Sequence, residues 1–165
     1  MQTFLPIATT NYREIAKTLD NKRLNKQALE GWQILMNLLA VDPAGNHREP
    51  KGWSNHPAVK MWRGHESSLL KYIIAMVDEW HARGYKSTIA DKAIFTFSRA
   101  TGINVSKESI DKLVVTGPDW LNNPAIAASH RLALLVKDYN WYSQFNWEED
   151  PGYPPTTYEY TWPVQ

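Results

Sequence analysis

Apolar residues recur every three or four positions through most of this chain, which is the spacing of one face of a helix. The clearest case is a helix predicted to start after Asp20 and to run to about Ala40. Its inward stripe is Leu24, Ala28, Trp32, Leu35 and Leu39. Asp20 stands where an N-cap residue stands, just before the pattern begins.

The same spacing predicts one longer helix from His56 to about Arg83, with Pro57 in the favoured first position and Gly84 at the C-cap. Further helices are expected over residues 12–19, 86–101, 106–114 and 125–137, the last with Ala128, Leu132 and Leu135 inward. Breaker residues predict loops over 41–56, 116–118 and 122–124.

No repeat and no long alternating pattern of apolar and polar residues is present, so strands are not predicted. We expect an all-α fold, a single compact multi-helix domain over residues 1–165 with a long central helix. From Asp138 onward the chain is rich in aromatic residues and proline. Residues 147–165 are predicted to form an acidic, aromatic tail packed on the body.

Composition limits the class of protein. At 165 residues and 43% hydrophobic, the chain can bury one sizeable core. It has no cysteine, which excludes disulfides and thiolate zinc sites. No apolar run approaches the roughly 18–20 residues of a membrane span, and the start lacks the features of a signal peptide. We therefore expect a cytoplasmic protein without membrane contact, and no obligate protein partner is evident.

Charge is unevenly distributed. The net charge is +1, but residues 148–165 hold four acidic and no basic residues, which leaves 18 basic and 13 acidic residues, or +5, on the body. This bias is mild, and the sequence pI of 7.9 is below the value of about 9 typical of nucleic-acid-binding domains. Eight Trp and eight Tyr are more unusual, and those outside the helical stripes could stack on bases.

The polar face of the helix after Asp20 is the first candidate site. Arg23, Lys26, Gln27 and Glu30 are three or four residues apart and share one surface. Two interpretations remain open. The face is either a solvated surface with an Arg/Lys–Glu pair, or a phosphate-binding site with a carboxylate inside it.

Other basic and aromatic residues could extend this face. Lys51, Trp53 and His56 lie in the first long loop, and Ser129-His130-Arg131 follow later. If the fold brings them to one side, they form a phosphate-binding surface with Trp53 free to stack on an unstacked base. The tail aromatics are Trp141, Tyr142, Phe145 and Trp147, and they either join this surface or lock the tail onto the core.

Carboxylates matter for chemistry at a sugar carbon that becomes positively charged. Asp20, Glu30 and Glu66 are the candidates in polar surroundings. A neighbouring cation keeps a carboxylate ionised, which suits stabilisation of a cationic transition state better than proton donation. No metal-ligand motif and no cofactor-binding motif is present, so we expect neither a metal nor a cofactor.

Six stretches together resemble the phage pyrimidine-dimer DNA glycosylase and apurinic-lyase family (endonuclease V type), and more closely its broad uncharacterised phage and bacterial branch. They are residues 3–6, 19–27, 55–62, 79–85, 128–132 and 141–145. The resemblance implies a small all-α domain that binds double-stranded DNA in the cytoplasm (of the host, if phage-encoded), extrudes a nucleotide and excises its base during repair.

In the characterised branch, the N-terminal amine attacks the sugar carbon, an imine forms, and β-elimination nicks the strand. By position, the resemblance gives His56 the place of a loop histidine, and gives Lys22, Lys26 and Arg131 the places of arginines. Arg23 stands where the family has its glutamate, which leaves that role to Asp20, Glu30 or Glu66.

Residue 2 is Gln, whose size disfavours removal of the first methionine, so the amine is expected to be that of Met1. The catalytic candidates are therefore Met1, Asp20, Arg23, Glu30 and His56. The candidates for DNA contact are Lys22, Lys26, Gln27, Lys51, Trp53, His130 and Arg131. Two alternatives remain open: a base-modifying enzyme on the same scaffold that does not nick DNA, and a DNA-binding module without chemistry.

Overall fold

The computed structural model describes residues 1–113 and 115–164, and within them it is all-helical, which confirms the expected fold class. The main helices are α1 (Tyr12–Thr18), α2 (Asn21–Leu39), α4 (Glu66–Ala82), α5 (Ile89–Thr101) and α6 (Pro124–Lys137). Shorter elements are α3 (Pro57–Lys60), α7 (Tyr139–Tyr142) and the 3-10 turns η1 (Trp53–Asn55), η2 (Ile110–Lys112), η3 (Asp119–Asn122) and η4 (Ser143–Phe145).

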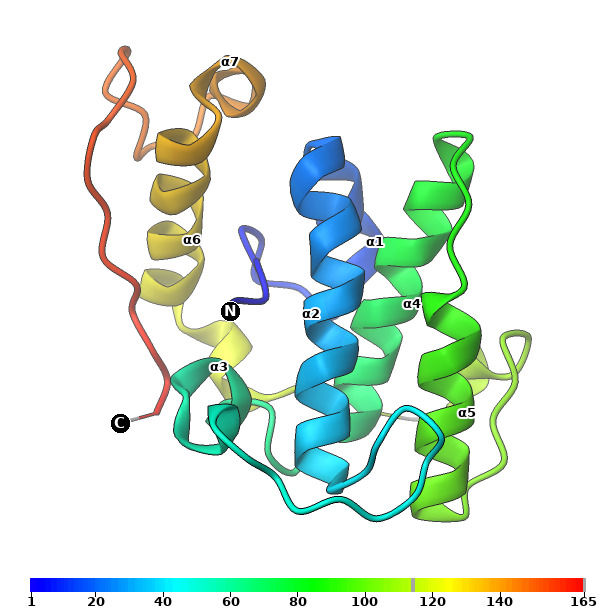
Figure 1. Ribbon diagram of the computed structural model, residues 1–165. Coiled ribbons are helices and arrows are strands. Elements are labelled where there is room, and N and C mark those ends of the chain that lie inside the picture. The colour runs from blue at the N-terminus through cyan, green and yellow to red at the C-terminus, as the bar shows by residue number, and fades with distance from the viewer. Residues whose placement is uncertain (114, 165) are drawn as a thin grey trace.

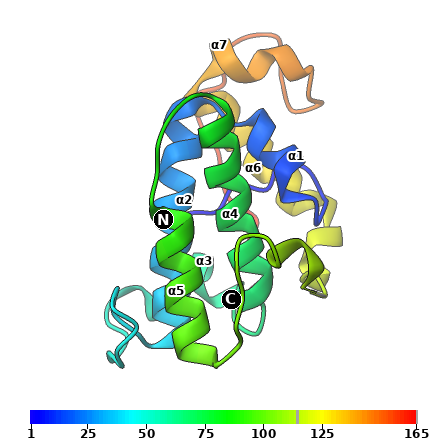
Figure 2. The ribbon, with the colours of Figure 1, turned by 90° about the vertical axis from the view of Figure 1, so that its right-hand side faces the viewer.

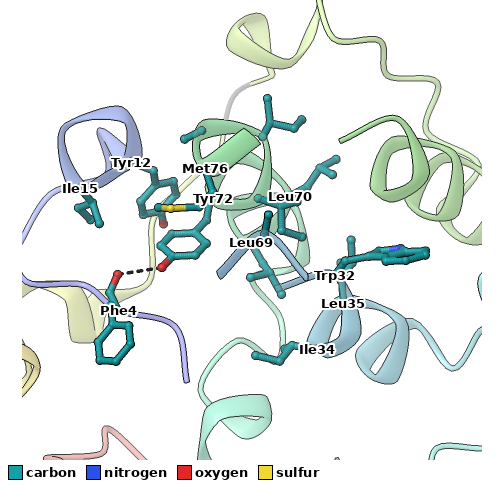
Figure 3. Packing of buried hydrophobic residues seen from close by; sticks show 14 of the residues in the cluster. Phe4, Tyr12, Ile15, Trp32, Ile34, Leu35, Leu69, Leu70, Tyr72 and Met76 are labelled. Carbon is teal, nitrogen blue, oxygen red and sulfur yellow. Dashed lines mark hydrogen bonds between the residues drawn. The ribbon is translucent and has the colours of Figure 1, made fainter. Parts of the chain in front are cut away.

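Helix α4 is the centre of the molecule and packs against α1, α2 and α5 (Figures 1 and 2). Side chains from these helices interlock in the core, among them Leu35, Leu69 and Tyr72 (Figure 3). The approach of α2 to α4 is close at Gly31, where an added Cβ would lie 2.7 Å from Cγ1 of Ile73. A larger residue at this position would push the two helices apart.

Most predicted helix boundaries are confirmed, together with their causes. The Asp20 carboxylate accepts the N–H of Arg23 at 3.4 Å, so Asp20 is the N-cap of α2. Pro57 is the first residue of α3, and Nδ1 of His56 accepts the N–H of Ala58 at 3.0 Å. Gly84 follows α4 with a positive φ of 92°.

The single helix predicted from His56 to Arg83 is wrong. The chain breaks between α3 and α4, and Gly64 in the break has a φ of 81°, a region that favours glycine. The Gly64 N–H donates to Oε1 of Glu66 at 3.0 Å, which closes the turn before α4. Val59 and Trp62 are buried around the break, so the apolar pattern continues through it and hides it.

Two smaller predictions need correction. The helix expected from residue 106 is only the 3-10 turn η2, because Ser106 and Ser109 hydrogen-bond to each other; its expected end, Val114, lies outside the described residues. In α6, Leu135 is buried, but Ala128 and Leu132 are only half-buried. The face of α6 that is turned to the core carries Ile126, Ala127, His130, Ala133 and Leu134.

The segment after α6 turns through α7 and η4 and then runs back along α6 (Figure 1). The Thr161 N–H donates to Oγ of Ser129 at 3.0 Å, which ties this tail to α6. Tyr142 is buried and stacks on Trp147 with ring centroids 5.7 Å apart. These aromatic side chains therefore lock the tail in place. None of the described helices has the length and apolar character needed to cross a membrane.

Candidate functional site

The first six residues form an extended segment between α2 and α6 (Figure 1), and residues 2–6 are buried. A buried segment without a neighbouring strand must satisfy its backbone groups with side chains. Glu30 accepts the Gln2 N–H at 3.1 Å, and Gln27 accepts the Phe4 N–H at 2.7 Å. We call residues 1–6 the N-terminal segment.

The other side of this segment is held by α4 and α6. Nδ1 of His130 accepts the N–H of Leu5 at 2.9 Å, and the Tyr72 hydroxyl donates to the Phe4 carbonyl at 2.9 Å (Figure 3). The guanidinium of Arg131 donates to the Pro6 carbonyl at 3.0 Å. The start of the chain is therefore fixed by side chains from three helices.

Three residues predicted to contact DNA are engaged in this way. Gln27 and His130 are buried, and Arg131 makes two hydrogen bonds to Glu149, of 2.7 and 2.6 Å, besides its contact with Pro6. Burial lowers the pKa of His130 to about 3, so its ring is neutral and can accept the backbone N–H. Their contact with DNA stays a prediction; the structure shows them holding the N-terminal segment.

The N-terminal segment opens into a hollow of about 360 Å³, which we call the amine hollow. It is lined by Met1, Gln2, Phe4, Lys22, Arg23, Lys26, Gln27, Glu30, Lys137, Tyr158 and Tyr160. Four of these side chains are cationic and one is a carboxylate, so the hollow attracts anions. The polar face predicted for the helix after Asp20 is thus one wall of a hollow.

Glu30 is the carboxylate of this hollow. Only 13% of its side chain is exposed; Oε2 accepts the Gln2 N–H, and Oε1 lies 3.5 Å from Nζ of Lys26. The bond to residue 2 places the carboxylate beside the start of the chain. Lys26 itself is 68% exposed, so its charge remains available to a ligand.

Asp20 has a different environment. It is buried and accepts a short hydrogen bond from the Tyr142 hydroxyl, and the Arg23 guanidinium donates to its carboxylate at 3.3 Å. Burial and this hydrogen bond raise the pKa of Tyr142. Asp20 does not line the amine hollow, and Glu66 bonds to Gly64 at the start of α4. Of the three candidate carboxylates, only Glu30 lines the hollow.

A second hollow of about 360 Å³, the Trp53 hollow, adjoins the first because Met1 lines both. Its lining is Met1, Gln33, Met36, Asn37, Val41, Arg48, Glu49, Pro50, Lys51 and Trp53. The lining of the Trp53 hollow is more apolar than that of the amine hollow and includes two cations, Arg48 and Lys51. Trp53 is 50% exposed. The predicted loop residues Lys51 and Trp53 therefore lie next to Met1.

His56 lies between these features. Its ring contacts Trp53 on one side, with centroids 5.1 Å apart, and Trp162 of the tail on the other, at 5.8 Å. Burial lowers the pKa of His56, the Met1 amine lowers it further, and Glu30 opposes both. The structure therefore places His56 within electrostatic reach of both Met1 and Glu30. The Asp20 carboxylate lies outside this group and is bonded to Arg23, which itself lines the amine hollow.

Sequence reasoning missed part of the lining, namely Arg48, Lys137, Tyr158 and Tyr160. A signal for the tail was present: Tyr158, Tyr160 and Trp162 alternate, and alternate residues of an extended segment share one face. Their rings are in contact, with centroids 5.1 and 5.4 Å apart. Among the described residues, no group of three His, Asp or Glu side chains is arranged to hold a metal ion.

Comparison with known proteins gives one match. The model of a family described as pyrimidine dimer DNA glycosylase matches residues 1–93. No curated protein and no solved structure shows a significant match to the chain. The matched part contains Met1, Glu30 and His56, whereas His130, Arg131 and the tail lie beyond it.

Proposed function

This chain belongs to the pyrimidine dimer DNA glycosylase family, and we propose that it removes a damaged or modified pyrimidine extruded from duplex DNA and then cleaves the strand as a lyase. One observation carries the proposal: Met1 and the carboxylate of Glu30 line the same cationic hollow, beside a segment that side chains hold rigidly. A nucleophile, a carboxylate and phosphate-binding cations are the groups that this reaction requires.

The Met1 amine is the nucleophile of the proposed reaction, because Met1 lines the amine hollow. The lone pair of the neutral amine forms a bond to C1′ of the sugar, and the glycosidic bond breaks with its electron pair on the base. The sugar ring then opens, and nitrogen and C1′ share an imine. Loss of a proton from C2′ expels the 3′ phosphate, which nicks the strand.

Glu30 supports these steps by position. Its carboxylate accepts the N–H of residue 2 and lines the same hollow as Met1, and in this role it takes up the proton that the amine loses on attack. Its negative charge also stabilises the positive charge that develops at C1′. His56, which is within electrostatic reach of the same groups, adds a second proton acceptor.

DNA contact is assigned to the exposed groups around the two hollows. Lys22, Lys26 and Lys51 are exposed and bind phosphates. Trp53 stacks on a base that has lost its partner. Gln27, His130 and Arg131 act indirectly, by fixing the N-terminal segment.

Borohydride trapping tests the proposal. Hydride reduces an imine to a stable amine, so incubation with duplex DNA that carries a thymine dimer, and separately with a duplex that carries an abasic site, should give a covalent complex. Mass spectrometry should place the DNA on the Met1 amine. Acetylation of that amine should abolish trapping.

Glu30→Gln should reduce trapping, and Glu108→Gln, at an exposed glutamate outside the hollow, should not. Base release that survives acetylation of the amine would disprove the amine mechanism. A changed base without a strand break would favour the base-modifying alternative.

A further inference from the structure

Gln2 is the neighbour of the proposed nucleophile, and its side chain has an unused donor. The residue is 5% exposed, and Oε1 accepts the Thr3 N–H at 2.8 Å, which fixes the orientation of the amide. Nε2 is buried and has no hydrogen-bond partner among the described residues. A buried donor left unpaired costs about 1–3 kcal/mol, so proteins seldom keep one without a reason.

The surroundings of this amide are those of the amine hollow, which Gln2 lines. Its backbone N–H is bonded to Glu30. The amide faces the Tyr160 hydroxyl, because burial raises the pKa of that tyrosine and a hydrogen bond from the Gln2 side chain opposes the rise, although the contact does not reach the geometry of an ordinary hydrogen bond to Nε2. Gln2 therefore lines the same hollow as Met1, and its amide is turned to the wall that the tail forms.

We propose that Nε2 of Gln2 donates a hydrogen bond to the O2 carbonyl of the pyrimidine that is being released, which makes Gln2 a catalytic residue for base release. This inference rests on the proposed function, because it takes Met1 as the group that attacks C1′. Consecutive Cα atoms are about 3.8 Å apart, so a donor on residue 2 can serve the same substrate atoms as the amine of residue 1.

The chemistry of the leaving group explains why O2 is the acceptor. When the bond between C1′ and N1 breaks, its electron pair stays with the pyrimidine and spreads over N1, C2 and O2. A hydrogen bond to O2 strengthens as this charge grows, so it stabilises the transition state more than the bound substrate. The released anion takes a proton from water, and the Gln2 amide keeps its own protons.

The same geometry favours pyrimidines over purines. O2 is attached to the carbon next to N1, close to the bond that breaks, whereas a purine has a ring nitrogen and no carbonyl in that place. Nε2 is covered in the free protein, so the carbonyl must take the place of a covering group. Tyr160 comes from a tail segment without helix, so in this proposal its side chain moves aside and gives up its ring contacts with His130 and Phe4.

A duplex that carries a dimer and a duplex that carries a preformed abasic site together separate the role of Gln2 in breaking the glycosidic bond from the later imine chemistry. Gln2→Glu keeps an oxygen for the Thr3 N–H but removes the donor, and Gln2→Met removes the donor without adding charge. Single-turnover cleavage of the glycosidic bond in a dimer-containing duplex, where the cleaved pyrimidine stays joined to its neighbour and is freed for detection by photoreversal, should fall about 10²-fold in both variants. Borohydride trapping on a duplex with a preformed abasic site, where no base remains, should stay within threefold of the unmodified protein.

Gln144→Glu, at an exposed glutamine of η4 outside both hollows, is the matched control and should change neither rate. A parallel fall of base release and abasic trapping would show that Gln2 only positions the N-terminal segment, which overturns the inference. Unchanged base release in Gln2→Met would overturn it as well. Absence of trapping in the unmodified protein would instead refute the proposed function on which the inference rests.

Discussion

Asp20 and Glu30 are two carboxylates of one helical region, separated by about 15 Å at 1.5 Å per residue, and their surroundings differ in kind. Asp20 is buried and bonded to Tyr142 and to Arg23. Glu30 holds one backbone N–H and a loose contact with an exposed lysine, and it lines the amine hollow. The contrast separates a carboxylate whose bonds hold the fold from one that lines a hollow and keeps unused bonding capacity, and only the second is assigned a role in the proposed reaction.

The largest expected effect comes from exchanging the two carboxylates for amides. Glu30→Gln should lower the rate of glycosidic bond cleavage by about 10²–10⁴-fold, because the proposed proton acceptor of the amine hollow is lost. Asp20→Asn should leave that rate within a few-fold and lower the free energy of unfolding by about 1–3 kcal/mol, because its buried hydrogen bonds are weakened. Single-turnover kinetics and urea unfolding measure the two quantities. A large loss of rate in Asp20→Asn together with an unchanged rate in Glu30→Gln would show that the two carboxylates do not divide the roles in this way.

His130 belongs with the fold-holding groups, and its titration tests this. Its pKa is lowered by burial from 6.5 to about 3, so the unfolded chain binds a proton at mildly acidic pH that the folded chain does not. Stability therefore falls as the pH drops below 6.5 and keeps falling until the pH approaches 3. Between pH 7 and pH 5 the expected loss is about 2 kcal/mol.

Urea unfolding at a series of pH values measures this dependence. His130→Asn retains an oxygen near the place of Nδ1 for the Leu5 N–H but does not titrate, so this part of the pH dependence should disappear. His47→Asn, at an exposed histidine of the first long loop, is the matched control and should retain it. If the free energy of unfolding of His130→Asn depended on pH in the same way as that of the unmodified protein, His130 would not be the group responsible for the loss of stability in acid.

The helices could be predicted from the sequence because each depends on local spacing and on capping residues such as Asp20 and Pro57. The break at Gly64 could not, because apolar residues on both sides continue one pattern. His130 and Arg131 resembled a DNA-binding pair, yet their partners Leu5 and Pro6 are 125 residues away. Contacts at that separation leave no periodic signal.

The sequence predicts only one wall of the amine hollow, the one that α2 forms. Lys26 and Glu30 share a helix face by spacing alone, so one wall could be predicted. The opposite wall, with Tyr158 and Tyr160, depends on the path of a tail that has no helix. That path is set by packing on α6, through contacts such as the bond from Thr161 to Ser129, and not by local preference.

Trp53 is an exposed aromatic side chain at the edge of the Trp53 hollow, where its ring is available to stack on a base. If it stacks on an unpaired base, Trp53→Ala should weaken binding to dimer-containing duplex about tenfold, because one base stack is worth about 1–3 kcal/mol. Tyr153→Ala, at an exposed tail aromatic outside both hollows, is the matched control. Fluorescence anisotropy measures both affinities. Equal losses in the two variants would indicate a general aromatic effect and not a stacking site.

The smallest effect is expected for single lysines. Lys22→Gln and Lys26→Gln should each reduce the slope of log affinity against log salt concentration by about 1, because each removes one phosphate contact. Lys112→Gln, at an exposed lysine of η2, should leave the slope unchanged. Anisotropy titrations at several salt concentrations give the slopes. A slope altered equally by all three would mean that the hollow has no special share in binding.

The clamp on the N-terminal segment also has a consequence for the order of events during synthesis. Leu5 and Pro6 receive their partners from residues 130 and 131, which leave the ribosome long after the first helices do. Closing so long a loop is entropically costly and comes late in folding. A nascent chain can therefore have its central helices packed while the N-terminal segment still lacks the partners that fix it.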